Sequence, residues 1–224
     1  MMGYLSETLG IDLAEFRRGL IAWGQEHYQF FPWRGTKDPY RILVAEIMLH
    51  RTQRSQVIPI YKRFIRRHPS IQAFLGARKG SLQRILQPLG LRWRADLMNE
   101  MRKVLNSQHN GRIPSEKAEL MDLPGVSDYV ASALRCFSWD LPEPLLDTNT
   151  VRVVGRLFGL EIKDYSRRSN RFRSILAELI DSERPREFTY AMLDLADQVC
   201  TIRKPPLCDV CPLSQWCTFA KRRS

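Results

Sequence analysis

Four of the five cysteines crowd into one eighteen-residue stretch near the end of the chain, with the spacing C-x7-C-x2-C-x5-C: Cys200, Cys208, Cys211 and Cys217. So many thiols in so short a segment predict a loop that folds around a metal or a metal cluster. Zinc sites usually combine Cys pairs with each other or with His, whereas here one C-x2-C is flanked by two single cysteines and no His lies between them. This uneven set favours a [4Fe–4S] cluster over zinc or disulfides, and disulfides would need an oxidising compartment. The fifth, Cys136, lies in an apolar stretch and is predicted to be a core residue.

The charge balance points to a polyanionic partner. The 224 residues carry a formal net charge of +11, which favours nucleic acid over a membrane surface, although a basic protein without such a partner is the simpler alternative. The first residues, MMGYLSETLG, do not resemble a signal peptide. No apolar run approaches ~18 residues, so we expect no membrane span and a cytoplasmic, nucleoid-associated monomer.

Helical periodicity dominates the sequence, and strand signals are poor. The pattern predicts an all-α chain of about ten helices. Asp38 and Asp147 are the predicted N-caps of two of them, and Ser55, Ser81 and Ser115 are further candidates. The main predicted helices lie near residues 12–28, 39–49, 92–105, 115–120, 128–137, 148–157, 170–181 and 186–199.

Two short segments carry the predicted chemistry. The first is the turn Leu123-Pro124-Gly125-Val126-Ser127 between two helices, which can direct backbone N–H groups towards a DNA phosphate without reading sequence. The second is Leu146-Asp147-Thr148-Asn149, eighteen residues after Tyr129. An aspartate there can cap a helix and still face a cleft.

In this order, LPGVSDY, LLDTNTVRVVGR and the four-cysteine loop resemble the endonuclease III superfamily of helix-hairpin-helix DNA glycosylases. The resemblance runs from about Phe16 to Cys217 and implies double-stranded DNA with a mismatched or damaged base as the partner. It implies two lobes with DNA across the cleft. Residues 37–140 would form a six-helix barrel with the hairpin at about 115–138, and residues 1–36 and 141–224 would form the lobe that holds the cluster loop 200–217. A monovalent cation at the hairpin is a second candidate cofactor.

The chain departs from the family pattern at two points. Ser127 stands where the hairpin usually has a second glycine, and it would be strained if that position needs positive φ. The first cysteine gap is seven residues, where the family usually has six.

The resemblance assigns a catalytic role to Asp147 and places Tyr129 and Glu46 in the base pocket. Bifunctional members carry a lysine at position 129 that forms a Schiff base, which tyrosine cannot do. We therefore expect a glycosylase with little or no lyase activity. The combination of Tyr129, Glu46 and the segment RILVAEIMLHRT is similar to Mig-type thymine/uracil mismatch glycosylases. Glu46 lies in an apolar segment, so we expect it to be buried or to face the cleft.

Further residues are expected to hold the DNA. The family's wedge and gap-filling positions correspond to His50, Arg51, Leu91 and Arg92, with phosphate contact as the alternative role for Arg92 and its neighbour Arg94. The basic pair Arg203 and Lys204 is expected to contact phosphates beside the cluster. The hairpin residues with this role are Leu123, Gly125, Val126 and Ser127.

Two other functions stay open at this point. One is an A/G-mismatch adenine glycosylase without the C-terminal 8-oxoguanine domain, which the segments Pro39-Tyr40 and Ala45-Glu46-Ile47-Met48-Leu49 also resemble. The other is a non-catalytic DNA-binding protein that uses the hairpin and the metal loop. Asp147 and Glu46 together argue against the latter, because binding alone requires neither.

Overall fold

The computed structural model is all-helical over the residues that it describes, which are residue 5, residues 10–90 and residues 92–222, with only the backbone of Lys79 and Arg92. No strand occurs in this described part, which confirms the all-α prediction. Twelve α-helices are present in it, rather than about ten, because four- and five-residue helices such as α4 (Ile71–Leu75) and α12 (Thr218–Lys221) are too short to show a period.

The chain divides into two compact units, one of which is discontinuous in sequence. Unit 1 comprises residues 1–29 and 140–224, and unit 2 comprises residues 30–139. The predicted lobe boundaries were residues 36/37 and 140/141. The assignment of a barrel to one lobe and a cluster to the other stays a prediction.

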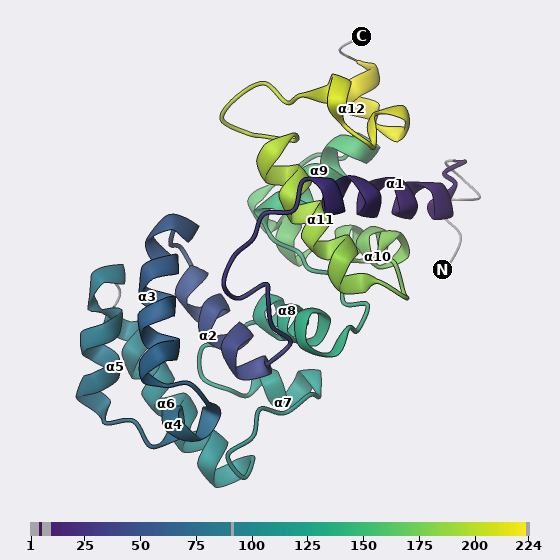
Figure 1. The fold of residues 1–224 in the computed structure, drawn as a ribbon. Coiled ribbons are helices and arrows are strands. Elements are labelled where there is room, and N and C mark those ends of the chain that lie inside the picture. Colours follow the sequence, from purple (N-terminus) through teal and green to yellow (C-terminus); the bar gives the residue numbers. More distant parts are fainter. Residues whose placement is uncertain (1–4, 6–9, 91, 223–224) are drawn as a thin grey trace. The chain divides into compact units, whose positions relative to one another are not determined.

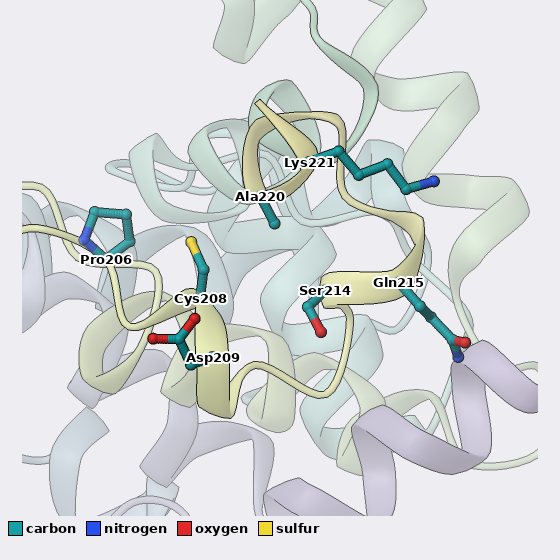
Figure 2. A pocket seen from close by; sticks show the side chains of 7 residues that line it. All are labelled: Pro206, Cys208, Asp209, Ser214, Gln215, Ala220 and Lys221. Atoms are coloured by element: carbon teal, nitrogen blue, oxygen red, sulfur yellow. The ribbon is translucent and has the colours of Figure 1, made fainter. Parts of the chain in front are cut away.

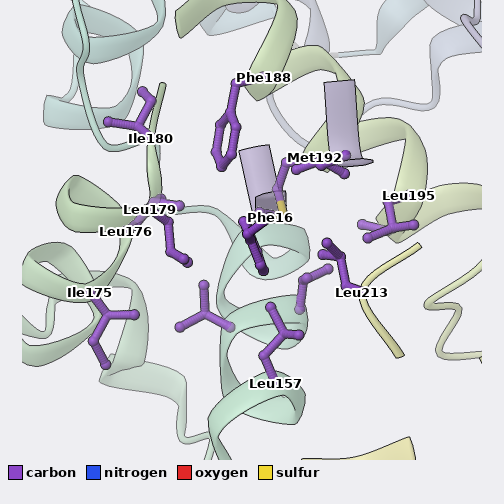
Figure 3. Packing of buried hydrophobic residues seen from close by; sticks show 14 of the residues in the cluster. Phe16, Leu157, Ile175, Leu176, Leu179, Ile180, Phe188, Met192, Leu195 and Leu213 are labelled. Atoms are coloured by element: carbon purple, nitrogen blue, oxygen red, sulfur yellow. The ribbon is translucent and has the colours of Figure 1, made fainter. Parts of the chain in front are cut away.

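Unit 1 is built around the pairing of its first helix with its last long one, which run close together in Figure 1. Its helices are α1 (Leu13–Glu26), α9 (Thr148–Phe158), α10 (Asn170–Leu179), α11 (Pro185–Gln198) and α12. Phe16 of α1, Leu157 of α9 and Phe188 of α11 meet in one hydrophobic core (Figure 3). Phe16 and Leu20 of α1 are fully buried in this core.

A glycine allows α1 and α11 to approach this closely. A Cβ atom on Gly24 would lie 2.3 Å from the Cβ of Ala191. Glycine inside a helix lowers stability by about 0.5–1 kcal/mol relative to alanine. Packing, and not helix propensity, therefore explains why residue 24 is glycine.

Unit 2 surrounds one largely buried helix. Its helices are α2 (Pro39–Leu49), α3 (Arg54–Arg67), α4, α5 (Lys79–Leu86), α6 (Arg92–Gln108), α7 (Lys117–Met121) and α8 (Asp128–Trp139). Eight of the eleven residues of α2 are buried, and α2 packs against α3 and α8. A helix that is apolar all round belongs in a core, and the buried Glu46 lies in this one.

The acidic N-caps were predicted correctly, whereas the serine caps were not. The side chain of Asp38 accepts a hydrogen bond from the backbone N–H of Tyr40, with Pro39 at the first helical position. Ser55 and Ser81 lie inside α3 and α5, which begin at Arg54 and Lys79. The short helix predicted from Ser115 begins at Lys117, and Arg135 of α8 donates to the Ser115 carbonyl at 2.6 Å instead.

Candidate active site

Asp147 lies at the start of α9, where its carboxylate is held in one orientation. Oδ1 accepts the backbone N–H groups of Asn149 and Thr150, both at 2.8 Å, and the Thr150 hydroxyl completes the capping box. Among the described residues, Oδ2 accepts a hydrogen bond only from the side-chain amide of Asn149, also at 2.8 Å. The group is half-buried. Oδ1 therefore caps the helix, and Oδ2 can still accept a hydrogen bond from another group.

A polar path connects Asp147 with the first cysteine of the loop. The Asn149 side-chain oxygen accepts from Nη2 of Arg152 at 3.2 Å, and Nε of Arg152 donates to the Cys200 carbonyl at 2.8 Å. Nη2 also donates to the Ala196 carbonyl. Burial lowers the pKa of Arg152, and the nearby Cys200 and Asp147 oppose that shift. The first turn of α9 thus holds the Asp147 carboxylate, and Arg152 in its second turn holds the start of the cysteine loop.

The cysteine loop is anchored on the same helix one turn later. Nη1 of Arg156 donates to the Cys200 sulfur at 3.2 Å and to the Thr201 carbonyl at 2.9 Å, and its guanidinium lies over the Phe219 ring. All five cysteines are free thiols, so none of the described cysteines is in a disulfide. Burial raises the pKa of Cys211 to about 11 and also raises the pKa of Cys217, and the nearby Cys200 and Cys208 add to both shifts.

The four thiols do not form a compact ligand set for one ion. Among the described residues, no three His, Cys, Asp or Glu side chains lie close enough together to hold a single metal ion. Cys208 instead lines a hollow of about 470 Å³ together with Ala220 and Lys221 of α12 (Figure 2). A cluster spreads its four thiolates over different iron atoms. Of the four thiols, Cys208 is the one that lines this hollow, so the fit to a cluster rests on the chemistry of the four-thiol donor set.

The predicted hairpin turn is present between α7 and α8. The Val126 N–H donates to the Leu123 carbonyl at 3.0 Å, and Gly125 has φ +85°. A Cβ at this glycine would also come within 3.0 Å of the Leu97 side chain. The side chains of Leu123 and Val126 are buried, whereas Gly125 and Ser127 are exposed. The turn therefore offers backbone groups rather than side chains to a partner.

Ser127 is not strained, because the condition for strain, a positive φ at this position, is not met. It is not among the described non-glycine residues with positive φ. Its hydroxyl accepts from the Val130 N–H at 3.4 Å, and its carbonyl accepts from Ala131. Serine therefore caps α8 where glycine would only bend the chain. The turn is braced by Lys117, whose ammonium group lies 3.1 Å from Asp128.

Glu46 and Tyr129 lie on two helices of unit 2 that pack against each other, α2 and α8. Glu46 is 8% exposed, as expected, and Tyr129 is half-buried in the first turn of α8. Asp147 belongs to unit 1. The meeting of all three in one pocket stays a prediction.

The loop after α2 presents Arg51 in an unusual backbone conformation. Arg51 is exposed and has φ +58°, and His50 beside it stacks edge-on against Trp93. Partial burial lowers the pKa of His50, and the positive charges of Arg51 and Arg94 lower it further. A bulky residue with positive φ is an outlier that something must hold in place.

Arg94 is what holds this loop. It is fully buried, and its Nη2 donates to the His50 carbonyl and to the Thr52 hydroxyl. The phosphate contact considered for Arg94 is therefore excluded. Leu91 lies outside the described residues, and so does the side chain of Arg92.

Arg203 and Lys204 are both exposed in the cysteine loop. The Thr201 hydroxyl donates to the Lys204 carbonyl at 2.8 Å and so closes the turn that carries them. Sequence reasoning missed three residues that support the site, namely Asn149, Arg152 and Arg156. Their spacing of three and four residues along the helix that begins at Asp147 was the available signal, because it places them on one face.

The comparisons with known proteins point to one enzyme class. No protein-family model matches the chain. The thymine-DNA glycosylase of Aeropyrum pernix is 38% identical over 208 residues, which cover 91% of this chain and 93% of that protein. The thymine/uracil-DNA glycosylase of Pyrobaculum aerophilum is 38% identical over 222 residues, covering 96% and 95%. A solved structure of a thermostable thymine-DNA glycosylase matches with a TM-score of 0.86 and 28% identity, covering 94% of this chain and 97% of that one.

Similarity extends to two other kinds of protein. The adenine DNA glycosylase of Mycobacterium tuberculosis is 35% identical over 202 residues, which cover 89% of this chain but 66% of that protein. A structure of endonuclease III in a trapped covalent complex with DNA shares the fold, with a TM-score of 0.77 at 21% identity over 95% of this chain and 99% of that one. None of the described helices is both long and apolar enough to span a bilayer.

Proposed function

Because the chain belongs to the helix-hairpin-helix DNA glycosylases of the endonuclease III superfamily, which hydrolyse N-glycosidic bonds, we propose that it removes thymine or uracil mispaired with guanine. The observation that carries this choice is the match to thymine/uracil-DNA glycosylases over nearly the full length of both chains. The adenine glycosylase match leaves a third of that longer protein uncovered. Family membership itself favours an enzyme over a non-catalytic DNA-binding protein.

Asp147 is the proposed catalytic carboxylate. Loss of the base builds positive charge on the deoxyribose, as in glycoside hydrolysis. An ionised carboxylate stabilises that charge and orients or deprotonates the attacking water. Its Oδ1 is occupied by two backbone N–H groups, so Oδ2 is the oxygen for this role. The hydrogen bonds fix the carboxylate before the substrate arrives, which reduces the reorganisation needed in the transition state.

Glu46 and Tyr129 are proposed to receive the base after it leaves the helix. Flipping costs a few kcal/mol and is easiest for a mismatched base, which itself favours wobble pairs. A buried carboxyl such as Glu46 is suited to hydrogen bonding with a base edge, and the phenol of Tyr129 offers a stacking face and a donor. Arg51 or Leu91 would fill the gap in the stack, and the positive φ of Arg51 supports the first choice.

The reaction is proposed to stop at the abasic site. Strand cleavage through a Schiff base needs an amine nucleophile, and position 129 holds a phenol instead. We expect little or no lyase activity for this reason.

The four-cysteine loop is proposed to hold a [4Fe–4S] cluster through Cys200, Cys208, Cys211 and Cys217. Bound there, the cluster would supply a rigid cross-link and needs no redox step. Arg203 and Lys204 lie between the first two ligands, both exposed and available for DNA phosphates. A cation at the hairpin stays a second, untested cofactor prediction.

The decisive experiment is base release from a set of duplexes with T·G, U·G, A·G and A·8-oxoG pairs. Each is assayed with and without alkali, for the wild type and for Asp147→Asn. We expect release from T·G and U·G only, strand breaks only after alkali, and a loss of about 10²–10⁴ in the variant's rate with duplex affinity retained. Release from the adenine duplexes alone would instead support the adenine glycosylase that the mycobacterial relative suggests.

A further inference from the structure

Unit 2 contains a second concave site that none of the predicted catalytic or hairpin residues lines. It is a hollow of about 370 Å³ between the start of α2 and the last turns of α3. Its polar lining consists of Arg41, Tyr61, Lys62 and Arg66, and Pro32 and Pro69 form part of its walls. Helix α2 has eleven residues, a length of about 16 Å. The hollow therefore lies at the opposite end of α2 from the Arg51 loop.

The charge around this hollow is positive. Arg41, Lys62 and Arg66 contribute three cations, and α3 contains no acidic residue. Asp38 lies next to the hollow, with Oδ2 3.5 Å from Nε of Arg41. The start of α2 and the end of α3 carry opposite partial charges that offset each other. Two excess positive charges remain, which suits an anion with two negative charges or a segment of a polyanion.

The Tyr61 hydroxyl is an available hydrogen-bond donor at the hollow. Within the described part of the chain, no group forms a hydrogen bond with the Tyr61 hydroxyl, although Tyr61 is only 3% exposed. Nε of Arg41 forms no hydrogen bond in the described part of the chain, but it faces Oδ2 of Asp38 at 3.5 Å. Burial raises the pKa of Tyr61 to about 12, so the phenol keeps its proton and remains a donor.

These observations have one chemistry in common. A guanidinium, an ammonium and a phenol O–H that converge on a small hollow match the oxygens of a phosphate group, because each phosphate oxygen accepts more than one hydrogen bond. We propose that this pocket binds a phosphate group, supplied either by the DNA backbone or by free phosphate. This site is independent of the base that the enzyme removes, so its failure would leave the proposed function untouched.

The test compares two full-length double variants that lose the same charge from the same helix. Lys62→Gln/Arg66→Gln removes two cations of the pocket, whereas Arg63→Gln/Arg67→Gln removes two exposed arginines that do not line it. A third variant, Tyr61→Phe, removes only the unused hydroxyl and keeps the ring packed edge-on against Trp33.

The first measurement is the thermal unfolding midpoint in sodium phosphate against sodium chloride at equal ionic strength. The second is the affinity for an undamaged duplex as a function of salt. If DNA supplies the phosphate, the pocket variant binds more weakly, and its salt slope falls by about 0.9 for each DNA phosphate that it no longer neutralises. If free phosphate is the ligand, phosphate raises the wild-type midpoint and not that of the pocket variant or Tyr61→Phe.

In both cases the Arg63/Arg67 control should follow the wild type more closely than the pocket variant does. Equal behaviour of the two double variants in both measurements would overturn the proposal, because only general charge would then matter. Wild-type behaviour of Tyr61→Phe in both measurements would also overturn it.

Discussion

At the scale of single residues, Asn149 is the nearest partner of the proposed catalytic oxygen. It donates to Oδ2 of Asp147 and accepts from Arg152, so it links the carboxylate to the rest of unit 1. A hydrogen bond to a charged group contributes about 1.5–3 kcal/mol. We predict that Asn149→Ala lowers the single-turnover rate of base release by about 10–100-fold, since 1.36 kcal/mol corresponds to a factor of ten.

The control for this variant is Thr148→Ala, at the exposed neighbouring position. It should leave the rate near that of the wild type, and both variants should bind the mismatched duplex with unchanged affinity. If Asn149→Ala weakened binding and left the rate intact, Asn149 would not act through Asp147.

In our proposal, Tyr129 is the reason that the enzyme releases the base without cleaving the strand. Replacing it with lysine introduces an amine on the first turn of α8, and desolvation lowers the pKa of an amine and makes it a nucleophile. Tyr129→Lys should therefore form a borohydride-trappable adduct with a T·G duplex and nick the strand without alkali. The variant Tyr129→Phe serves as the control and should form no adduct. A wild-type protein that is itself trapped by borohydride would contradict the assignment.

At the scale of helices, the contact between α1 and α11 depends on the absence of one side chain. Gly24→Ala brings two Cβ atoms to 2.3 Å unless the helices separate. Overpacking of this kind typically costs 1–3 kcal/mol, and we predict a loss of about that size in the free energy of unfolding. Gly19→Ala in the same helix is the matched control, because a Cβ there meets nothing within 4 Å. It should instead stabilise the protein by about 0.5–1 kcal/mol. Denaturant titration of both variants, with opposite signs expected, checks the contact.

The positions of the long helices were predictable because each depends on a local pattern. The N-cap residues were only partly predictable. Asp38 and Asp147 directly precede helices, and their carboxylates accept hydrogen bonds from the free N–H groups of the first turn. Serine is as good a cap as aspartate, but α3 and α7 have Gln53 and Glu116 at their N-cap positions, so Ser55 and Ser115 miss by two residues and one residue. Ser70, which does cap α4, was missed because a five-residue helix shows no period.

The site was predicted through its residue types, and its supports were not. A cleft-facing carboxylate or a hairpin follows from a motif, but the burial of Arg94 beneath the Arg51 loop does not. Nothing in the sequence separates Arg94 from the neighbouring arginines that we propose to contact DNA, because the distinction arises only when α6 packs in unit 2. The same holds for the pocket at Tyr61, whose residues come from α2, α3 and the segments before and after them.

At the scale of the whole molecule, the pairing of distant segments also escapes local patterns. Unit 1 joins residues 1–29 to residues 140–224, and α1 packs on α11 more than 150 residues later. Only the resemblance to a known family predicted such a division. Periodicity identifies the buried face of each helix but not the helix that covers it.

The cysteine loop lies within this long-range packing, so loss of its proposed cluster should be felt throughout unit 1. Leu213 of the loop is fully buried in the core, and the Trp216 ring lies 5.3 Å from that of Phe16. We predict that Cys208→Ser loses the iron and sulfide of the cluster, lowers the thermal unfolding midpoint and weakens DNA binding. The control variant is Cys136→Ala, which changes a cysteine in the core of unit 2. This variant should contain as much iron as the wild type. Iron and sulfide analysis with the visible spectrum of each purified protein provides the measurement. A colourless wild-type protein that contains zinc would contradict the cluster, and the four thiols would then be zinc ligands.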